Sequence, residues 1–274
     1  MTELVVRRLL IDLGTSFERC WNGGDAFRSA WLNALSLSFP VGEQFFIDSV
    51  RNGVKTLPAA ERERFAGAVE GFIGQEATHR RIHALFNAQL ERQGYVNRIE
   101  TRALRRIERM QGWDPRHAVA QTAAIEHFTA ILAHWLLTTP DALAGAEPRL
   151  ATMWLWHAAE ETEHRSVAFD VYKAMGGDER WRVRWMRIVT CFFVTDVLRQ
   201  VVRNLWHDDA LLRWSTWRSA ARVLFGSHGL IRRTWKPWLA YFRPGFHPSQ
   251  QETRLAEQWL RENAAQFTVV RSNP

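Results

Sequence analysis

The chain has 274 residues and a formal net charge of +7; 46% of its residues are hydrophobic and 24% are charged, which is ordinary for a soluble globular protein. This length suffices for one large domain or for a core with an extension. The two cysteines, Cys20 and Cys191, make no disulfide framework, and the N-terminus does not resemble a secretory signal. No apolar run approaches the ~20 residues that a membrane-spanning helix needs. We therefore expect a cytoplasmic protein.

Helical periodicity runs through almost the whole sequence, and sustained alternation of apolar and polar residues is hard to find. The sequence therefore predicts an all-α fold. Helices are expected, in chain order, at residues 25–37, 40–54, 58–93, 99–110, 115–138, 147–175, 179–206, 209–225, 228–241 and 250–265.

Capping residues and helix breakers define several of these limits. Asp25, Asp114 and Asp178 each stand where a side-chain carboxylate can accept hydrogen bonds from the first amides of a helix. Pro40 suits the first turn of a helix, where its missing N–H costs nothing, and Gly53 suits a C-terminal stop. The segment between residues 25 and 54 is therefore expected to contain two short helices.

Charge and tryptophan are unevenly distributed. Between Arg180 and Arg243 there are thirteen Lys/Arg and three Asp, a net charge of +10, which leaves −3 on the remainder, and eight of the fourteen tryptophans lie after position 180. Because the composition changes at Gly176-Gly177, we predict two parts. Residues 1–176 would form a di-metal helical bundle with an N-terminal extension, and residues 177–274 an Arg/Trp-rich helical extension packed on it.

Two Glu-x-x-His pairs, Glu76/His79 and Glu161/His164, are the clearest chemical signal. Residues three apart lie on one face of a helix, so each pair presents a carboxylate and an imidazole to the same point. His157 lies four residues before Glu161 on the same face, which gives the pattern His-x-x-x-Glu-x-x-His. These residue types at this spacing predict metal ligands.

A four-helix di-metal carboxylate site needs two Glu-x-x-His helices and one lone glutamate from each of two others. Glu43 and Glu126 precede the two pairs in the required order. Glu126 lies in an otherwise apolar helix, where a carboxylate is costly unless it is paired or metal-bound. Glu43 has a difficulty, because a helix that starts at Pro40 puts it in the first turn. Either the site lies near one end of that helix, or residues 25–54 form one helix kinked at Pro40.

Other titratable residues near these positions have a less specific pattern. A single Glu-x-x-His pair is common on a solvated helix face, so the prediction rests on the whole set. We favour His83 as an outer partner of the ligands. Glu160 and Glu163 point away from the Glu161/His164 face, which favours solvation or pairing with arginine. Three further histidines are expected to be unrelated to the site: His117, His127 and His134.

Four stretches resemble a bacterial family labelled predicted metal-dependent hydrolases, which has a ferritin-like helical core. They are Asn33–Phe46, Gly74–His83, Glu161–Asp170 and Tyr241–Pro248. The resemblance implies a ferritin-like four-helix bundle with a di-metal centre and additional C-terminal helices. The family label implies hydrolysis.

The ligand set is also similar to that of the di-iron arylamine N-oxygenases, which add a histidine to the usual six ligands. His157, Glu161 and His164 match their His-x-x-x-Glu-x-x-His helix. Glu76 with His79 matches the other pair, and the lone glutamates are Glu43 and Glu126. This similarity covers the site rather than the whole chain.

Three functions compete at this point. The leading hypothesis is an O₂-activating di-iron oxygenase that acts on a small apolar or amine substrate and needs an electron donor. Two Fe ions are expected, with Mn or a mixed Mn/Fe pair as the alternative, because carboxylate-rich sites suit both metals. The second hypothesis is a dinuclear hydrolase, in which water activated by the metals attacks an ester or amide. The third is a non-catalytic ferritin-like metal binder with peripheral membrane association.

The segment 180–243 has two interpretations. One is a helix buried in the core or in a homodimer interface. The other is peripheral attachment to anionic lipid, because arginines flank an apolar stretch and tryptophans follow it. Nucleic acid is not expected, because no recognised binding motif accompanies the basic residues.

Overall fold

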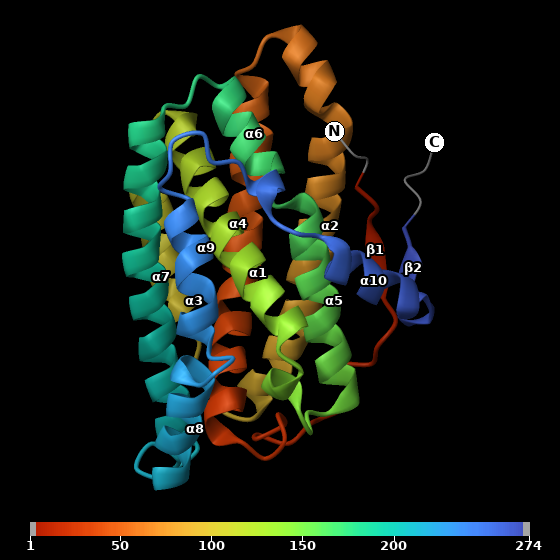
Figure 1. Ribbon diagram of the computed structural model, residues 1–274, viewed down its shortest axis with the longest axis vertical. Coiled ribbons are helices and arrows are strands. Elements are labelled where there is room, and N and C mark those ends of the chain that lie inside the picture. Colours follow the sequence, from red (N-terminus) through yellow and green to blue (C-terminus); the bar gives the residue numbers. More distant parts are fainter. Residues whose placement is uncertain (1–3, 271–274) are drawn as a thin grey trace.

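The computed structural model describes residues 4–270, and these are mostly helical (Figure 1). The longer helices are α1 (Ala26–Lys55), α2 (Ala59–Arg92), α4 (Pro115–Thr138), α5 (Pro148–His164) and α7 (Glu179–His207). The shorter helices are α3 (Ile99–Arg109), α6 (Val167–Ala174), α8 (Trp214–Phe225), α9 (Leu230–Ala240) and α10 (Arg254–Glu262). Two short strands, β1 (Arg7–Leu9) and β2 (Phe267–Val269), form an antiparallel pair. The all-α prediction is confirmed.

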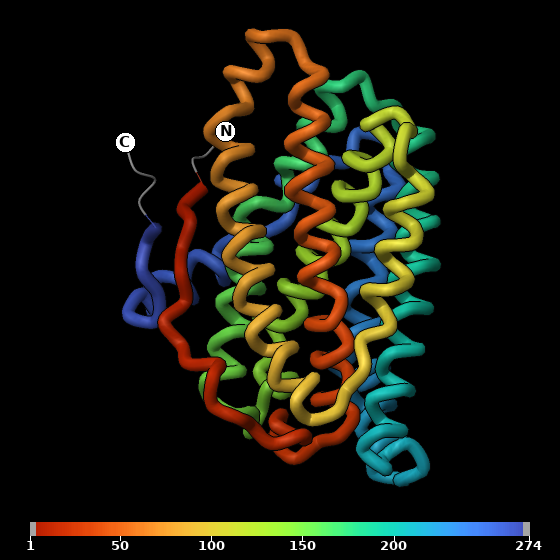
Figure 2. The backbone as a smooth tube through the Cα atoms, turned by 180° about the vertical axis from the view of Figure 1, so that it is seen from behind, coloured from red at the N-terminus to blue at the C-terminus, as the bar shows by residue number. Residues whose placement is uncertain are grey.

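Four helices form the central bundle. α1 packs along α2, α4 packs along α5, and α1 also contacts α4. α3 returns the chain from the end of α2 to the start of α4, so that α4 runs antiparallel to α1 (Figure 2). The C-terminal helices cover this bundle, with α7 against α1 and α4, α9 against α4, and α10 against α5. No helix within residues 4–270 is long and apolar enough to cross a membrane.

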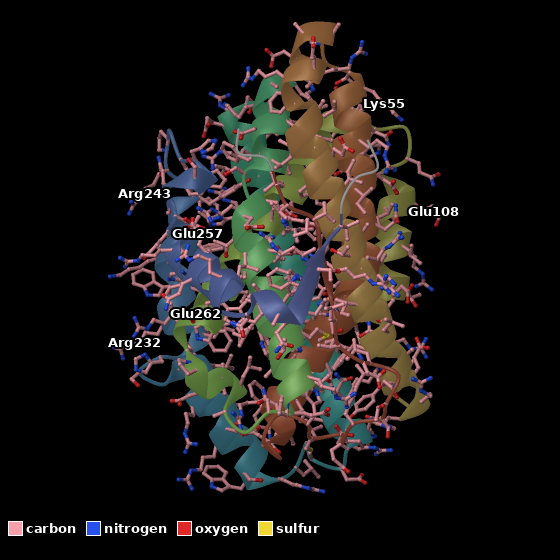
Figure 3. The ribbon with its side chains drawn as sticks, turned by 90° about the vertical axis from the view of Figure 1, so that its right-hand side faces the viewer. Lys55, Glu108, Arg232, Arg243, Glu257 and Glu262 are labelled. Carbon is pink, nitrogen blue, oxygen red and sulfur yellow. The ribbon has the colours of Figure 1, made fainter. Side chains whose placement is uncertain are left out.

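The predicted caps are present. Asp25 accepts a hydrogen bond from the Arg28 amide (3.0 Å) at the start of α1, and Asp178 accepts one from the Trp181 amide (2.8 Å) at the start of α7. Asp114 caps α4 in the same way. At the surface, charged side chains project outward from α9, α10 and the segment between them, among them Arg232, Arg243, Glu257 and Glu262 (Figure 3).

Several boundaries differ from the predicted ones: α1 continues through Pro40, and α8 begins at Trp214 rather than at residue 209. Gly53 does not end a helix: it lies inside α1, where an added Cβ would come within 2.6 Å of Val119, so its role is to let α1 and α4 approach closely. The expected helix 147–175 is interrupted after His164. There the Arg165 guanidinium donates to the Thr162 carbonyl (2.5 Å), which in an unbroken helix would accept the amide of residue 166.

The apolar core is divided into two clusters along the bundle axis. On α1 the first cluster ends at Leu37 and the second begins at Phe46, while on α2 the second ends at Phe72 and the first begins at Ile82. Between these positions lies a layer of buried glutamates and histidines. The core therefore holds the polar side chains away from both ends of the bundle.

Candidate metal centre

Pro40 lies inside α1, and the structure explains how the helix continues through it. Proline has no N–H, so the Ser36 carbonyl one turn earlier loses its helical donor. The Asn87 side-chain amide on α2 supplies that donor at 2.9 Å. Glu43 consequently lies in the middle of a long helix rather than in a first turn. Of the two arrangements considered for residues 25–54, the single helix is correct.

Seven side chains with metal-ligating atoms meet in the polar layer. They come from the four bundle helices, and none exposes more than 3% of its surface. The set is Glu43 from α1, Glu76 and His79 from α2, Glu126 from α4, and His157, Glu161 and His164 from α5. The structure thus brings together every residue that the sequence proposed as a ligand.

The donor atoms form two groups. One group contains an atom from each of four residues, all within 4.8 Å of one another: Glu76, His79, Glu161 and His164. The second group, with the same spacing, contains Glu43, His83 and His157. Glu126 adjoins the first group, since its Oε2 lies 3.4 Å from His164 Nε2. Two neighbouring groups are what two metal ions would need.

The carboxylates of Glu43 and Glu126 carry the strongest indication of a cation. Both oxygens of each are buried, and none of the four has a hydrogen-bond partner within residues 4–270. A buried carboxylate without a hydrogen-bond partner is costly, and protein interiors normally hydrogen-bond it or bind it to a metal. Among the described residues, the Glu126 carboxylate has only the 3.4 Å contact with His164 Nε2. The arrangement therefore fits metal ions between the helices.

The pKa directions describe how the metal-free cluster balances its charge. Burial, reinforced by Glu76, raises the pKa of Glu43 well above its usual value. Burial also raises the pKa of Glu126. Burial alone would lower the pKa of His79, but its contacts with Glu160 and Glu161 raise it to about 10. Protons on these groups thus supply positive charge that metal ions would replace.

Two imidazoles each use one ring nitrogen outside the cluster and leave the other facing it. His79 Nε2 contacts Glu160 Oε2 at 2.9 Å, and Arg7 contacts the other oxygen of Glu160 at 3.1 Å. His164 Nδ1 contacts Gln75 Oε1 at 2.9 Å. The remaining nitrogens, His79 Nδ1 and His164 Nε2, are buried without a hydrogen-bond partner in the described part of the chain. Outer hydrogen bonds of this kind fix the orientation of metal-ligating histidines.

A longer chain of contacts orients His157. Its Nδ1 lies 2.6 Å from His83 Nε2, and His83 Nδ1 lies 2.8 Å from Ser36 Oγ. Ser36 Oγ also lies 2.7 Å from Asn87 Oδ1. Because Asn87 donates its amide to the Ser36 carbonyl, its Oδ1 must accept, and the single hydroxyl hydrogen of Ser36 goes to it.

The direction in which the Ser36 hydroxyl donates fixes the positions of the hydrogens on His83 and His157. His83 Nδ1 then donates to Ser36 Oγ. Burial lowers the pKa of His83 well below its usual value, so the ring is neutral and its Nε2 accepts from His157 Nδ1. This leaves His157 Nε2 with a free lone pair 2.9 Å from Glu161 Oε1. Burial lowers the pKa of His157 to about 4, so a cation between these two acceptors satisfies every contact without a second proton on that ring.

The titratable residues beside the candidate ligands agree only in part with what the sequence predicted for them. Glu160 and Glu163 do pair with an arginine, Arg7, but Glu160 is fully buried, so the alternative of a solvated side chain is wrong for it. His83 occupies the outer position that was favoured, although it also belongs to the second donor group. His127 faces away, with its Nε2 3.0 Å from the Pro237 carbonyl.

Sequence reasoning missed the outer partners of the imidazoles: Arg7, Ser36, Gln75 and Asn87. Gln75 immediately precedes Glu76, as Glu160 precedes Glu161, so a polar residue directly before each ligand pair was an available signal. Arg7 could not be found in that way, because it is positioned by long-range contacts of β1 with β2 and with α2.

The comparisons with known proteins agree with this site. Searches of curated proteins and of solved structures gave no match. The family model described as predicted metal-dependent hydrolase matches residues 5–252, which include all seven candidate ligands and their outer partners. The chain therefore belongs to the predicted metal-dependent hydrolase family.

Proposed function

We propose that this protein is an enzyme with a dinuclear metal centre and that hydrolysis is its reaction. Seven ligands hold the two metals: Glu43, Glu76, His79, Glu126, His157, Glu161 and His164. The observation that carries the metal centre is the pair of buried carboxylates, Glu43 and Glu126, whose oxygens lack hydrogen-bond partners within residues 4–270. Hydrolysis is supported by the family description.

The chain's residues have defined tasks in this reaction. Metal ions bound here would act as Lewis acids and lower the pKa of water. Four glutamate carboxylates balance the charge of two divalent ions, and the outer partners hold the three imidazoles in place. The two apolar clusters exclude bulk water from the polar layer, which strengthens the electrostatic interactions within it.

Oxidation by O₂ at two Fe ions, with Mn as the alternative, is the second candidate. One observation favours it: the outer carboxylate nearest the ligands, Glu160, is already held by His79 and Arg7, so it is not free to take a proton from water. The His-x-x-x-Glu-x-x-His helix and the burial of all four glutamates also suit redox metals. This reaction would need an electron donor.

One set of experiments separates the two candidates. The purified chain is loaded with Zn²⁺, Mn²⁺ or Fe²⁺ and assayed with p-nitrophenyl esters of increasing chain length, with a chelated sample as the control. The Fe²⁺ form is also mixed with O₂ in a stopped-flow spectrophotometer. Chelator-sensitive esterase turnover without an optical transient supports hydrolysis. An optical transient without esterase turnover would favour oxidation over hydrolysis. Inertness in both assays would reject the proposal that the protein is an enzyme.

A further inference from the structure

An apolar cavity of about 730 Å³ lies beside the metal layer, between α1, α3, α4 and α7. Its volume is in the ~300–1,000 Å³ range of pockets for small organic molecules. Aromatic and aliphatic side chains make most of its wall, including Phe45, Phe46, Ile107, Met110, Trp185 and Phe192. An apolar ligand would gain free energy by displacing water from this space.

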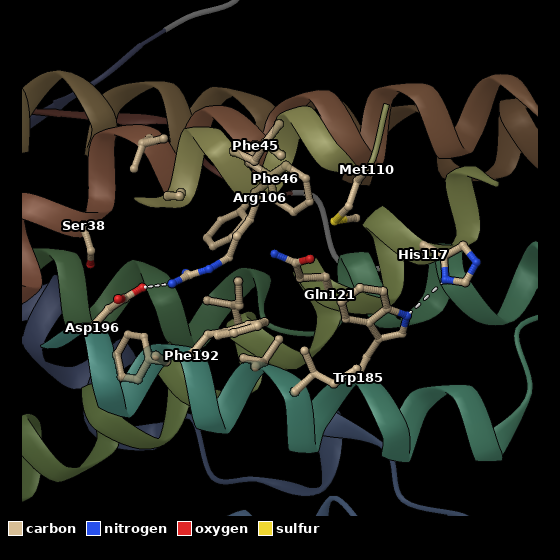
Figure 4. Close-up of a pocket in the computed structure, with 18 of the residues that line it drawn as sticks. Ser38, Phe45, Phe46, Arg106, Met110, His117, Gln121, Trp185, Phe192 and Asp196 are labelled. Carbon is tan, nitrogen blue, oxygen red and sulfur yellow. Dashed lines mark hydrogen bonds and ion pairs between the residues drawn. The ribbon is translucent and has the colours of Figure 1, made fainter. Parts of the chain in front are cut away.

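Polar groups stand at the two ends of the cavity (Figure 4). At one end Arg106 Nη2 pairs with Asp196 at 2.6 Å. At the other end the Trp185 indole N–H donates to His117 at 3.3 Å. Gln121 points into the space between them. The cavity therefore fits an elongated molecule.

Phe39 and Thr129 connect this cavity with the metal layer. Both also line a second, smaller cavity of about 40 Å³, whose wall includes His157 and Glu161. The Phe39 ring centroid lies 4.7 Å from that of His157. Phe39 and Thr129 therefore stand between the apolar cavity and two of the candidate ligands.

A cationic groove adjoins the Asp196 end. It is lined by Arg98, Arg102, Arg199 and Arg203 together with the apolar side chains of Leu198, Val202 and Trp206. The cavity wall reaches Ile99 on α3 and Val197 on α7, and the groove wall includes the residues next to each of them, Arg98 and Leu198.

The arginines of this groove differ in their partners. Arg102 is held by Asp196 at 2.5 Å. Arg98, Arg199 and Arg203 form no ion pair within the described chain. The groove therefore has unpaired positive charge next to the mouth of an apolar cavity.

We propose that the groove and the cavity together bind a single-chain anionic amphiphile, with its head group at Arg199 and Arg203 and its chain in the cavity. This inference rests on the proposed function for one point only, that the bound chain is the substrate of the metal centre. Ser38, the neighbour of Phe39, lies at the Asp196 end in Figure 4, so the bonds nearest the head group would lie nearest Phe39.

Binding is tested with the full chain, both metal-free and Zn²⁺-loaded. Hexadecanoate and lysophosphatidylglycerol are titrated below their micelle concentrations by calorimetry and by tryptophan fluorescence, since Trp113, Trp181 and Trp185 line the cavity. We expect saturable binding with one molecule per chain. The head group that binds more tightly identifies the source of the amphiphile, and either result supports the proposal.

Variants separate the two halves of the site. Ala103→Phe fills the cavity and should weaken hexadecanoate and uncharged hexadecanol alike by about tenfold or more. Ile107→Trp is a second filling variant in case the first does not fold. Arg199→Gln with Arg203→Gln should weaken only hexadecanoate, by roughly tenfold. Arg218→Gln with Arg222→Gln, two exposed arginines on α8, is the matched charge control and should change neither.

Three results would overturn the proposal: no saturable binding, full affinity in the folded filling variants, or equal loss for alcohol and carboxylate in the double arginine variant. Metal content is measured on the same samples. Amphiphile binding to a chain that takes up no metal would reject the metal centre and leave this inference intact. Two bound metals without amphiphile binding would do the reverse.

Discussion

Asn87 offers a test of the centre from outside its ligand set. In the chain of contacts from Asn87 through Ser36 and His83 to His157, the Asn87 acceptor oxygen decides which way the Ser36 hydroxyl donates. Asn87→Leu removes that acceptor. The hydroxyl hydrogen is then free for His83 Nδ1, which favours the reversed proton order, in which His157 Nε2 carries a hydrogen that a metal would have to displace.

The expected loss of metal affinity follows from the general cost of removing an outer hydrogen bond. Loss of an outer hydrogen bond to a ligating histidine typically lowers metal affinity by ~10–100-fold, or ~1.4–2.7 kcal/mol. We expect that loss for the metal held by His157 and little change for the other one. Asn87→Leu also leaves the Ser36 carbonyl at Pro40 without its donor, which should cost ~1–3 kcal/mol of folding stability.

Asn87→Asp is the matched control. It loses the same donor to the Ser36 carbonyl but keeps an acceptor for the Ser36 hydroxyl. Calorimetric titration with Zn²⁺ should therefore show weakened binding of one ion in Asn87→Leu and not in Asn87→Asp. Long-range ¹⁵N–¹H spectra of histidine in the Zn²⁺-loaded protein report which ring nitrogens carry hydrogen. Wild-type affinity in Asn87→Leu, or a hydrogen on His157 Nε2 in the loaded wild type, would refute the proton order.

Three further outcomes are expected. Glu126→Ala should abolish binding of at least one metal ion, whereas the exposed control Glu108→Ala should still bind two. Elemental analysis measures the stoichiometry, and an unchanged value in Glu126→Ala would contradict the assignment of one ligand to each lone-glutamate helix. The raised pKa values of Glu43 and Glu126, and of His79 at about 10, mean that the folded metal-free chain holds more protons than the unfolded chain, so its melting temperature should fall as the pH rises from about 7 to 10. Metal replaces these protons, so the loaded protein should change less, and identical melting profiles would contradict this. Peripheral membrane attachment through residues 180–243 stays a prediction, which the 69% and 79% exposure of Trp206 and Trp214 supports. The protein should sediment with anionic vesicles at low salt, and less of it should do so when both tryptophans are changed to Ser. Failure of the wild type to sediment would reject the prediction.

The helical fold and the convergence of the candidate ligands could be predicted from local pattern. Period-3.6 hydrophobicity, aspartate caps and the Glu-x-x-His spacing each extend over only one or two helical turns. They can therefore be recognised in a single sequence. The continuity of α1 through Pro40 could not be predicted with the same ease, because the compensating donor, Asn87, lies 51 positions away from Ser36.

The same physical reason explains the other omissions. Arg7 reaches Glu160 over 153 positions because β1 pairs with β2 and also packs on α2. The break after His164 depends on where the buried Arg165 side chain finds carbonyl partners, including that of Pro248. Long-range contacts of this kind leave little trace in local periodicity. The ligand roles themselves remain a prediction until metal is bound.

The most direct test of the central claim is a crystal structure of the metal-loaded chain with anomalous diffraction recorded at the absorption edge of the metal, together with elemental analysis of the same protein. We predict two anomalous peaks in the polar layer, one among Glu76, His79, Glu161 and His164 and the other beside Glu43 and His157, with two metal ions per chain. A single peak, or none within reach of Glu43 and Glu126, would contradict a dinuclear centre.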